Sequence, residues 1–162
     1  RDALWVFVIL RRYNTLNINA KYFGSVSYEE ADSIHIINGL IGFEDHTQYL
    51  PIPFQEEDDS MISLQCLDDE TLSFILMNPF GLFPDYAPAL SKQDLRELDA
   101  DSPEDISYYV ISVIRDSVAE STVNLKAPLA VNALNRKAKQ VILDQPEYTF
   151  RHALGDIAHK ED

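Results

Sequence analysis

The chain has 162 residues, 46% of them hydrophobic, with 27 acidic residues, 13 basic residues and a formal net charge of −14. This length and apolar content suit one folded domain, while the negative charge opposes direct binding of nucleic acid, which requires clustered Lys and Arg. The single cysteine, Cys66, excludes an internal disulfide, and no apolar run is long enough to span a bilayer. We expect a cytoplasmic protein whose charge would attract a basic partner at long range, with the alternative that the acidic residues serve solubility alone.

The first fifteen residues differ in character from those that follow. Leu4–Leu10 form an apolar run followed by two arginines, whereas a secretory signal carries its basic residues before the apolar segment. We interpret residues 1–15 as an N-terminal extension, either an added edge strand or sequence outside the native domain. We hypothesise that Leu16 marks the initiation site, which mass spectrometry of the native protein would test.

Most of the chain after this extension is predicted to form short strands separated by turns. Three early strands are indicated by apolar stretches at 18–23, 34–37 and 49–52. Apolar residues also alternate at 61–67 and 72–77, on either side of the acidic Asp68–Asp69–Glu70. These two segments are predicted to pair as a hairpin that turns at the acidic triplet.

The second half of the chain continues the same pattern. Residues 106–114 are β-branched and aromatic with both faces largely apolar, which is typical of a strand in the middle of a sheet. Residues 129–132 and 138–143 flank Asn135–Lys137 and are predicted to form another hairpin.

One helix is predicted between these strands. Ser91 can cap it, Asp94 lies three residues further on, and Leu95 and Leu98 share a face. A further short turn is expected at Ser102–Asp105. The sequence thus predicts a mainly β fold, a single-domain antiparallel β-barrel or roll with one or two short helices. The domain is expected to cover residues 16–152, followed by a polar C-terminal tail at 153–162.

Motifs for catalysis or for a cofactor are not found in the sequence. The four histidines are scattered without metal-ligand spacing, and there is no nucleophile elbow, phosphate-binding loop or dinucleotide fingerprint. The acidic runs at 56–59 and 68–70 lack the alternation of a calcium loop and are interpreted as solvated loops. Cys66 alternates with Ile62 and Leu64, which favours a small core residue over a nucleophile. We predict a protein without enzymatic activity, metal or cofactor.

Four segments are unusual for a generic β domain, and Lys21–Gly24 precedes them. They are Asn38–Phe43, Met77–Phe80, Ser121–Pro128 and Lys139–Leu143. In this order they resemble the FliW family, and the resemblance covers the chain from about Leu16 to His152. The combination of N-P-F and N-L-K-A-P is the specific part. The chain departs from the family at Ile41, where proline is frequent.

The resemblance implies a function in flagellar assembly. FliW proteins bind CsrA, a small RNA-binding dimer that represses translation of flagellin messenger RNA, and they also bind flagellin. Accumulated flagellin occupies FliW and releases CsrA, whereas export of flagellin frees FliW to capture CsrA. Such a switch requires two mutually exclusive partners and no chemistry. A monomeric protein-binding chaperone and CsrA antagonist is therefore expected.

The first candidate binding site is Asn78-Pro79-Phe80. Pro79 is expected to end a strand, leaving Asn78 to bind a partner's backbone and Phe80 to fill an apolar groove. The alternative is a turn that Asn78 caps, with Phe80 in the core. Three further residues are expected beside Phe80 as an exposed surface for an amphipathic helix: Leu82, Phe83 and Tyr86.

Two more groups of candidate residues follow along the chain. Asn124 and Lys126 are predicted to project from one face of a strand, with the alternative that Lys126 is buried against a carboxylate. The densest acidic stretch is expected to steer basic CsrA or, for at least half its members, to be solvated surface. Its residues are Asp94, Glu97, Asp99, Asp101, Glu104 and Asp105.

Two other classes of protein are compatible with the sequence. A hydrolase-like enzyme would use scattered carboxylates and His152 in a barrel mouth, and it would need a polar pocket with perturbed acids. A structural subunit of a larger assembly would need an exposed, self-complementary apolar face.

Overall fold

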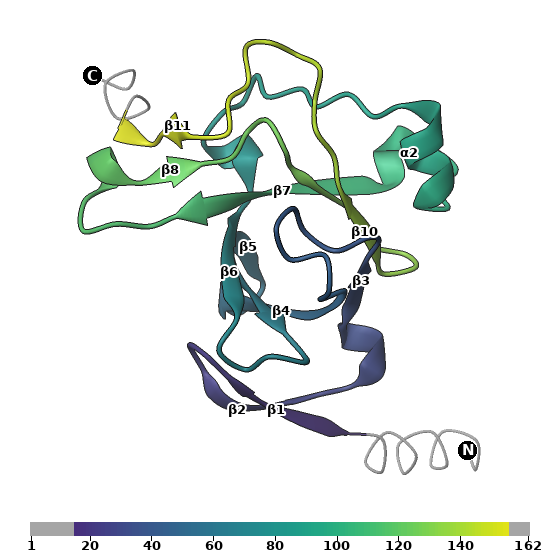
Figure 1. Ribbon diagram of the computed structural model, residues 1–162, viewed down its shortest axis with the longest axis vertical. Coiled ribbons are helices and arrows are strands. Elements are labelled where there is room, and N and C mark those ends of the chain that lie inside the picture. The colour runs from purple at the N-terminus through teal and green to yellow at the C-terminus, as the bar shows by residue number, and fades with distance from the viewer. Residues whose placement is uncertain (1–14, 156–162) are drawn as a thin grey trace.

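The computed structural model describes residues 15–155, which fold around a closed barrel of seven strands (Figure 1). The barrel strands are β3 (Ile34–Ile36), β4 (Gln48–Gln55), β5 (Asp58–Cys66), β6 (Ser73–Met77), β7 (Ile106–Val113), β9 (Leu129–Asn132) and β10 (Lys137–Gln140). Neighbours in this order are hydrogen-bonded, and β10 closes the barrel on β3. The pairing of β10 with β3 is parallel and the other six are antiparallel. The predicted mainly β barrel is confirmed.

The remaining elements lie at the two ends of the barrel (Figure 1). A separate hairpin of β1 (Leu16–Ala20) and β2 (Gly24–Tyr28) lies at one end. At the other end are α2 (Lys92–Glu97) and the pair β8 (Thr122–Val123) and β11 (His152–Ala153), with β8 also bonded to β7. Residues 15–155 also contain four single-turn 3-10 helices: η1 (Glu30–Asp32), η2 (Pro79–Gly81), η3 (Pro103–Asp105) and η4 (Val118–Glu120).

Strand β7 separates two hydrophobic cores. Tyr109 and Ile111 pack on the core inside the barrel, whereas Ile106, Tyr108 and Val110 belong to a second core outside it. The second core is covered by α2 and by the chain after β10. Because both faces of β7 are covered, its nearly continuous apolar sequence is explained, and the prediction of a strand in the middle of a sheet is confirmed.

Both predicted hairpins and the predicted helix are present. β5 pairs with β6 across the acidic triplet, and β9 pairs with β10. Ser91 and Asp94 form a reciprocal capping box at the start of α2, and Ser102 caps η3. The strand predicted at 138–143 is β10, which ends earlier, at Gln140, because the amide of Val141 bonds to the Pro128 carbonyl outside the ladder.

The prediction of a strand at 18–23 is wrong at its end. β1 stops at Ala20, residues 21–23 form a turn, and β2 begins at Gly24, whose φ of 66° is favourable for glycine. The apolar Tyr22 and Phe23 that suggested a longer strand instead pack their rings near Phe54.

The glycine-punctuated loop between β3 and β4 has a steric requirement for Gly39. Its φ is 69°, and a Cβ there would lie 2.8 Å from both the Glu44 Cα and the Phe43 carbonyl oxygen. Any larger residue would therefore have to displace backbone atoms.

The predicted extension at 1–15 and the predicted tail at 153–162 lie almost wholly outside the described residues. Initiation at Leu16 stays a prediction. Within residues 15–155, no helix combines the length and apolar character needed to cross a membrane.

Candidate functional site

The Asn78-Pro79-Phe80 segment is a capped turn that leaves one ring exposed. The Asn78 Oδ1 accepts a hydrogen bond from the Phe80 amide at 3.1 Å, so this side chain caps η2 as the alternative interpretation required. Pro79 is buried. Phe80 is 41% exposed, which agrees with its prediction as a surface residue.

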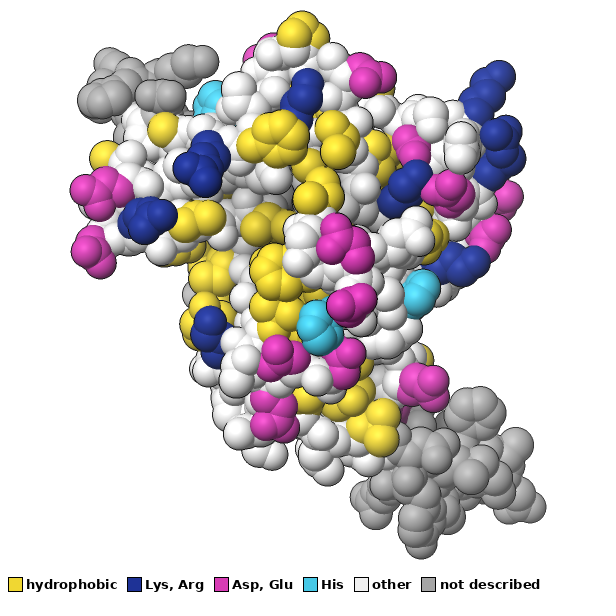
Figure 2. Space-filling model, viewed as in Figure 1, with side chains coloured by type: hydrophobic (Ala, Val, Ile, Leu, Met, Phe, Trp, Pro, Cys, Tyr) yellow, Lys and Arg dark blue, Asp and Glu magenta, His cyan; other side chains and the backbone are white. Residues whose placement is uncertain are grey.

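The exposed Phe80 ring has aromatic neighbours on its buried side. Its centroid lies 5.9 Å from that of Tyr86 and 6.3 Å from that of Tyr108. Leu82 and Phe83 are half-buried beside it in the sequence and pack on the second core. We call Phe80, Leu82 and Phe83 the aromatic patch. On the face of the molecule drawn in Figure 2, where individual residues are not labelled, hydrophobic side chains form a band along the middle, with both acidic and basic side chains on either side.

The expectation that Tyr86 is exposed is wrong. Tyr86 is only 5% exposed, and its hydroxyl donates a 2.8 Å hydrogen bond to the Leu125 carbonyl. Its ring also meets Tyr148 nearly edge-on at 4.8 Å. Tyr86 thus supports Phe80 from beneath, because tertiary contacts with the chain beyond β10 cover it.

Tyr108 connects the aromatic patch to the acidic helix α2. Its ring contacts Phe80, and its pKa is raised by burial and by the nearby charge of Asp94. An apolar ring and a carboxylate therefore both lie near one tyrosine. The exposed Phe80 ring is suited to a partner segment that presents an apolar side chain to it.

The acidic residues of α2 are held by a lysine from β10. Lys139 Nζ lies 2.7 Å from Asp94 Oδ1 and 2.5 Å from Glu97 Oε2. Burial opposes ionisation of Asp94, but hydrogen bonds from Lys139 and Ser91 hold its pKa below the usual value. Hydrogen bonds from Lys139 and Gln93 likewise lower the pKa of Glu97. Part of the predicted negative surface is therefore neutralised.

We expect Lys139→Met to lower the melting temperature by about 3 °C at neutral pH, as for a partly exposed ion pair. Because folding lowers the pKa values of Asp94 and Glu97, both carboxylates stabilise the fold at pH values above their ordinary pKa values of 3.8 and 4.5. This stabilisation is lost as the pH falls through the lowered pKa values of the folded protein. Burial lowers the pKa of Lys139, but the hydrogen bonds to Asp94 and Glu97 outweigh this effect and raise the pKa above 10.5. The contribution of Lys139 to stability is therefore fully present below pH 10.5.

The difference in melting temperature between Lys139→Met and the unchanged protein should therefore be constant from about pH 5 to 10 and shrink below about pH 4. Thermal melts across pH measure it. Lys137→Met is the matched control, because its pair with Asp99 is more exposed, at 40% and 61%. A Lys139→Met difference that persists at pH 3 would show that packing rather than charge is responsible.

The other acidic candidates are more exposed. Asp99 pairs with Lys137, while Asp101 and Glu104 have no ion pair within residues 15–155. These two side chains are exposed at the loop between α2 and β7 and remain candidates for steering a basic partner.

Asn124 and Lys126 lie in a bend after β8 rather than in a strand. The predicted alternation of burial is nevertheless present, because Asn124 and Lys126 are half-buried whereas Leu125 and Ala127 are buried. Asn124 Oδ1 accepts from the Ala127 amide at 2.9 Å. Lys126 Nζ donates to the Gln145 carbonyl at 3.0 Å, so its partner is a backbone oxygen and not the carboxylate of the alternative interpretation.

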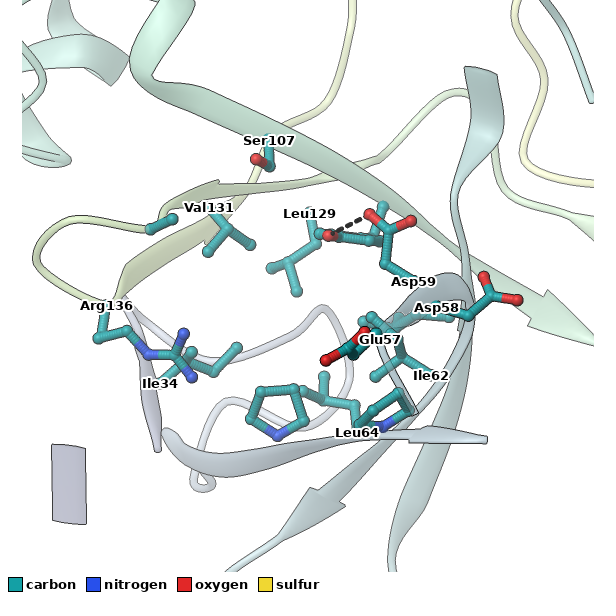
Figure 3. Close-up of a pocket in the computed structure, with 15 residues that line it drawn as sticks. Ile34, Glu57, Asp58, Asp59, Ile62, Leu64, Ser107, Leu129, Val131 and Arg136 are labelled. Atoms are coloured by element: carbon teal, nitrogen blue, oxygen red, sulfur yellow. Dashed lines mark hydrogen bonds between the residues drawn. The ribbon is translucent and has the colours of Figure 1, made fainter. Parts of the chain in front are cut away.

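A cavity of about 380 Å³ opens on the other face of β7. Its walls are mostly apolar, with Arg136 on one side and Glu57 and Asp59 facing it from the other (Figure 3). Asp59 Oδ2 accepts hydrogen bonds from Tyr109 at 2.9 Å and from the Asn78 side chain at 3.2 Å. The cavity wall is therefore tied to the turn that presents Phe80.

Sequence reasoning missed this cavity and its polar residues. Asp59 belonged to an acidic run that was interpreted as solvated loop, and Arg136 to a hairpin turn. One signal in the sequence could have indicated a second polar site: Tyr108 and Tyr109 are adjacent in one strand, so their side chains point to opposite faces of the sheet. Nothing in the sequence indicated that Asp59 would meet Tyr109, which is fifty residues away.

A model of the FliW protein family matches residues 17–154, which is nearly the whole described part of the chain. The chain belongs to the FliW family. The flagellar assembly factor FliW of Ruminiclostridium cellulolyticum is 37% identical over 145 residues, which cover 90% of this chain and 98% of that relative. The FliW of Shouchella clausii is 35% identical over 84% of this chain and 92% of that relative.

A solved structure agrees with this assignment. A crystal structure of the flagellar assembly factor FliW matches with a TM-score of 0.79 and 32% identity, covering 86% of this chain and 96% of that one. The FliW match includes every candidate residue described above, so the aromatic patch and the acidic helix both belong to the family domain.

Proposed function

We propose that this FliW-family chain is a non-catalytic binding protein that antagonises the translational regulator CsrA and binds flagellin in a mutually exclusive exchange. The single observation that carries the proposal is the contact of the exposed Phe80 ring with Tyr108, which also lies near the Asp94 carboxylate. Aromatic anchors beside charged groups are typical of protein-binding surfaces. The partner identities rest on the family resemblance.

The ionisable groups favour binding over catalysis. Within residues 15–155, each carboxyl group with a clearly shifted pKa is shifted downward. A lowered pKa leaves a carboxyl group without a proton to donate near neutral pH and makes it a weak base. His152, which the enzyme hypothesis needed in the barrel mouth, instead packs edge-on against Phe83 at 4.9 Å.

A calorimetric titration of the full chain with CsrA, repeated in the presence of flagellin, tests the proposal. We expect saturable binding of CsrA that disappears once flagellin has occupied the protein, because mutually exclusive partners lower each other's apparent affinity. Simultaneous binding of both partners would contradict the exchange. Absence of heat with CsrA at several salt concentrations and temperatures would contradict the antagonist function.

Salt should distinguish the two partners. We expect the association rate with CsrA to fall about tenfold between low and physiological ionic strength, because attraction to the net −14 charge is screened. The rate with flagellin should change less. Stopped-flow measurements at matched temperatures give both slopes, and Asp101→Asn with Glu104→Gln should flatten only the CsrA slope. Equal slopes for both partners would mean that the acidic loop does not steer CsrA.

We further propose that the protein acts in the cytoplasm as a monomer. Flagellin and a translational regulator meet in that compartment before export. Gel filtration at several concentrations should give a constant apparent mass near 18.5 kDa. A mass that rises with concentration would favour the structural-subunit hypothesis.

A further inference from the structure

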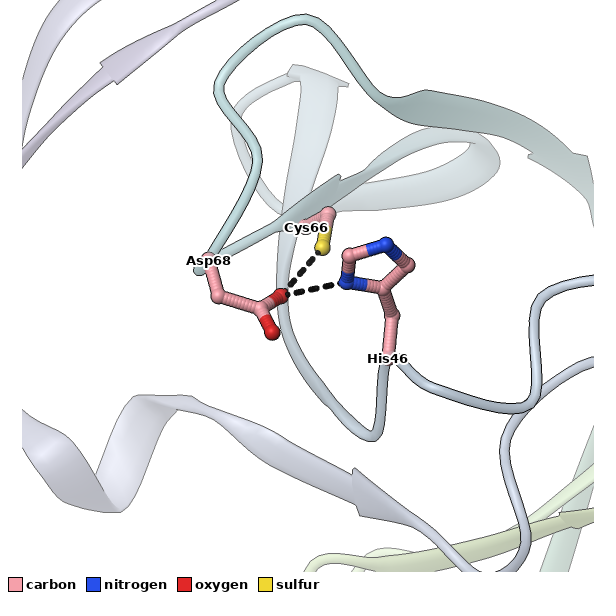
Figure 4. Close-up of side chains that lie close together, drawn as sticks. All are labelled: His46, Cys66 and Asp68. Atoms are coloured by element: carbon pink, nitrogen blue, oxygen red, sulfur yellow. Dashed lines mark hydrogen bonds and ion pairs between the residues drawn. The ribbon is translucent and has the colours of Figure 1, made fainter.

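Three side chains with different donor atoms converge beside the β5–β6 hairpin (Figure 4). His46 Nδ1 lies 2.9 Å from Asp68 Oδ1, and Cys66 Sγ donates to the same oxygen at 2.8 Å. All three candidate ligand atoms lie within 4.8 Å of one another. One carboxylate oxygen therefore joins a nitrogen and a sulfur donor from separate parts of the chain.

The elements that present these residues differ in rigidity. Cys66 is the last residue of β5 and is fully buried, so its sulfur is fixed by the barrel wall. Asp68 follows in the turn, with a side chain that is 59% exposed, and His46 comes from the loop before β4, with a side chain that is 28% exposed. One ligand position is thus fixed, two can adjust, and solvent reaches the group from one side.

The spacing is compatible with a tetrahedral zinc ion. Zn–S bonds of about 2.3 Å and Zn–N or Zn–O bonds of about 2.1 Å place neighbouring ligand atoms about 3.4 to 3.6 Å apart. The contact between Cys66 Sγ and Asp68 Oδ1 would have to lengthen by about 0.8 Å from 2.8 Å, and that between His46 Nδ1 and Asp68 Oδ1 by about 0.5 Å from 2.9 Å. Rotation of the exposed Asp68 side chain supplies such a movement without displacing β5.

A second observation comes from the strand opposite Cys66. Tyr49 is the direct antiparallel partner of Cys66, so the two side chains point to the same face of the sheet. Tyr49 is fully buried, and its hydroxyl has no hydrogen-bond partner within residues 15–155. A buried hydroxyl without a protein partner is unusual, and this one belongs to the same core cluster as Cys66.

We propose that His46, Cys66 and Asp68 form a binding site for a zinc ion, with water at the fourth position. The mixed nitrogen, sulfur and oxygen donors suit zinc better than calcium or magnesium, which prefer oxygen ligands alone. Binding forms a bond between zinc and the Cys66 thiolate, and the thiol proton leaves to solvent. The site is independent of the aromatic patch and of the proposed exchange of partners.

The test uses the full chain after treatment with a chelator and desalting. Titration with Co²⁺ should produce a thiolate-to-cobalt charge-transfer band that saturates at one ion per chain, and added Zn²⁺ should remove the band by displacement. Absence of the band at millimolar Co²⁺ would overturn the proposal. A band that needs two chains per ion would overturn it in favour of a site shared between molecules.

Variants assign the ligands. Cys66→Ser should abolish the charge-transfer band, and His46→Gln and Asp68→Asn should each weaken Zn²⁺ binding about 100-fold in competition with a chromophoric chelator. His152→Gln is the control histidine, because it lies against Phe83 at the other end of the barrel. If Cys66→Ser fails to fold, the exposed Asp68→Asn decides, and unchanged Zn²⁺ affinity in that variant would exclude the site.

Discussion

Replacing Gln65 by Leu is expected to lower the free energy of unfolding by about 3 kcal/mol. Gln65 is fully buried, and its Oε1 accepts a 2.9 Å hydrogen bond from the Lys21 amide. Its Nε2 donates to the carbonyl groups of Glu70 and Leu72, each at 3.2 Å. One side chain thus joins the turn of the β1–β2 hairpin to the turn between β5 and β6. Leucine has a similar volume but removes the acceptor of the Lys21 amide and the Gln65 donor of the Glu70 carbonyl, which is the costly way to lose a hydrogen bond. The Leu72 carbonyl keeps its bond from the Cys66 amide.

Urea denaturation of both proteins measures this difference, with equal slopes as the check that both unfold in one step. Gln93→Leu is the matched control: Gln93 lies on the surface of α2 and bonds only to Glu97, so a change within about 0.5 kcal/mol is expected. If Gln65→Leu were as stable as that control, the amide would have no role in holding the two turns together.

Gln65 also illustrates which information the sequence lacked. In 61–67 the apolar Ile62, Leu64 and Cys66 indicated the inward face of the strand, and the structure confirms it. Ser63 and Gln65 alternate with them and would ordinarily face solvent, yet both are fully buried. An alternating pattern shows which side chains share a face of the sheet. It cannot show that another segment of the chain covers the outer face and buries Ser63 and Gln65 there.

Local signals, by contrast, were sufficient for several elements. The capping box at Ser91, the proline at the first position of η3 and the acidic turn of the β5–β6 hairpin each depend on residues only a few positions apart. Strand β7 was also predictable, because burial of both faces leaves a continuous apolar sequence. The parallel pairing of β10 with β3 was not, because it joins residues about a hundred positions apart.

The candidate site likewise combines features that local sequence predicts with features that depend on contacts between distant segments. Asn78 as a cap and Phe80 as an exposed ring follow from the turn itself. The burial of Tyr86 depends on the Leu125 carbonyl, and the partial neutralisation of α2 depends on Lys139 from β10. Both contacts connect segments that are distant in sequence, so the composition of the surface could be predicted but its distribution of charge could not.

Phe80→Ala is expected to weaken binding of both proposed partners, CsrA and flagellin, by about 2 kcal/mol, or roughly 30-fold in Kd. The ring is held on its buried side by Tyr86 and Tyr108, so little conformational freedom is lost when a partner covers the exposed side. Alanine removes the apolar area while the cap at Asn78 keeps the backbone turn. Calorimetric titrations of the variant against each partner measure the loss.

Phe54→Ala is the matched control, because Phe54 is 37% exposed and packs against Phe23 at the opposite end of the barrel. Both variants lose a partly exposed ring, so both should lose similar stability, and thermal melts will verify this. A loss of affinity confined to Phe80→Ala would therefore reflect the position of the ring rather than a general loosening of the fold.

If Phe54→Ala weakened binding more, the partner surface would lie at the β1–β2 end, far from the acidic helix. If Phe80→Ala weakened one partner only, CsrA and flagellin would occupy different surfaces, and their mutual exclusion would have to be transmitted through the barrel. The hydrogen bonds that join Asn78, Asp59 and Tyr109 are the structural connection through which such coupling would pass.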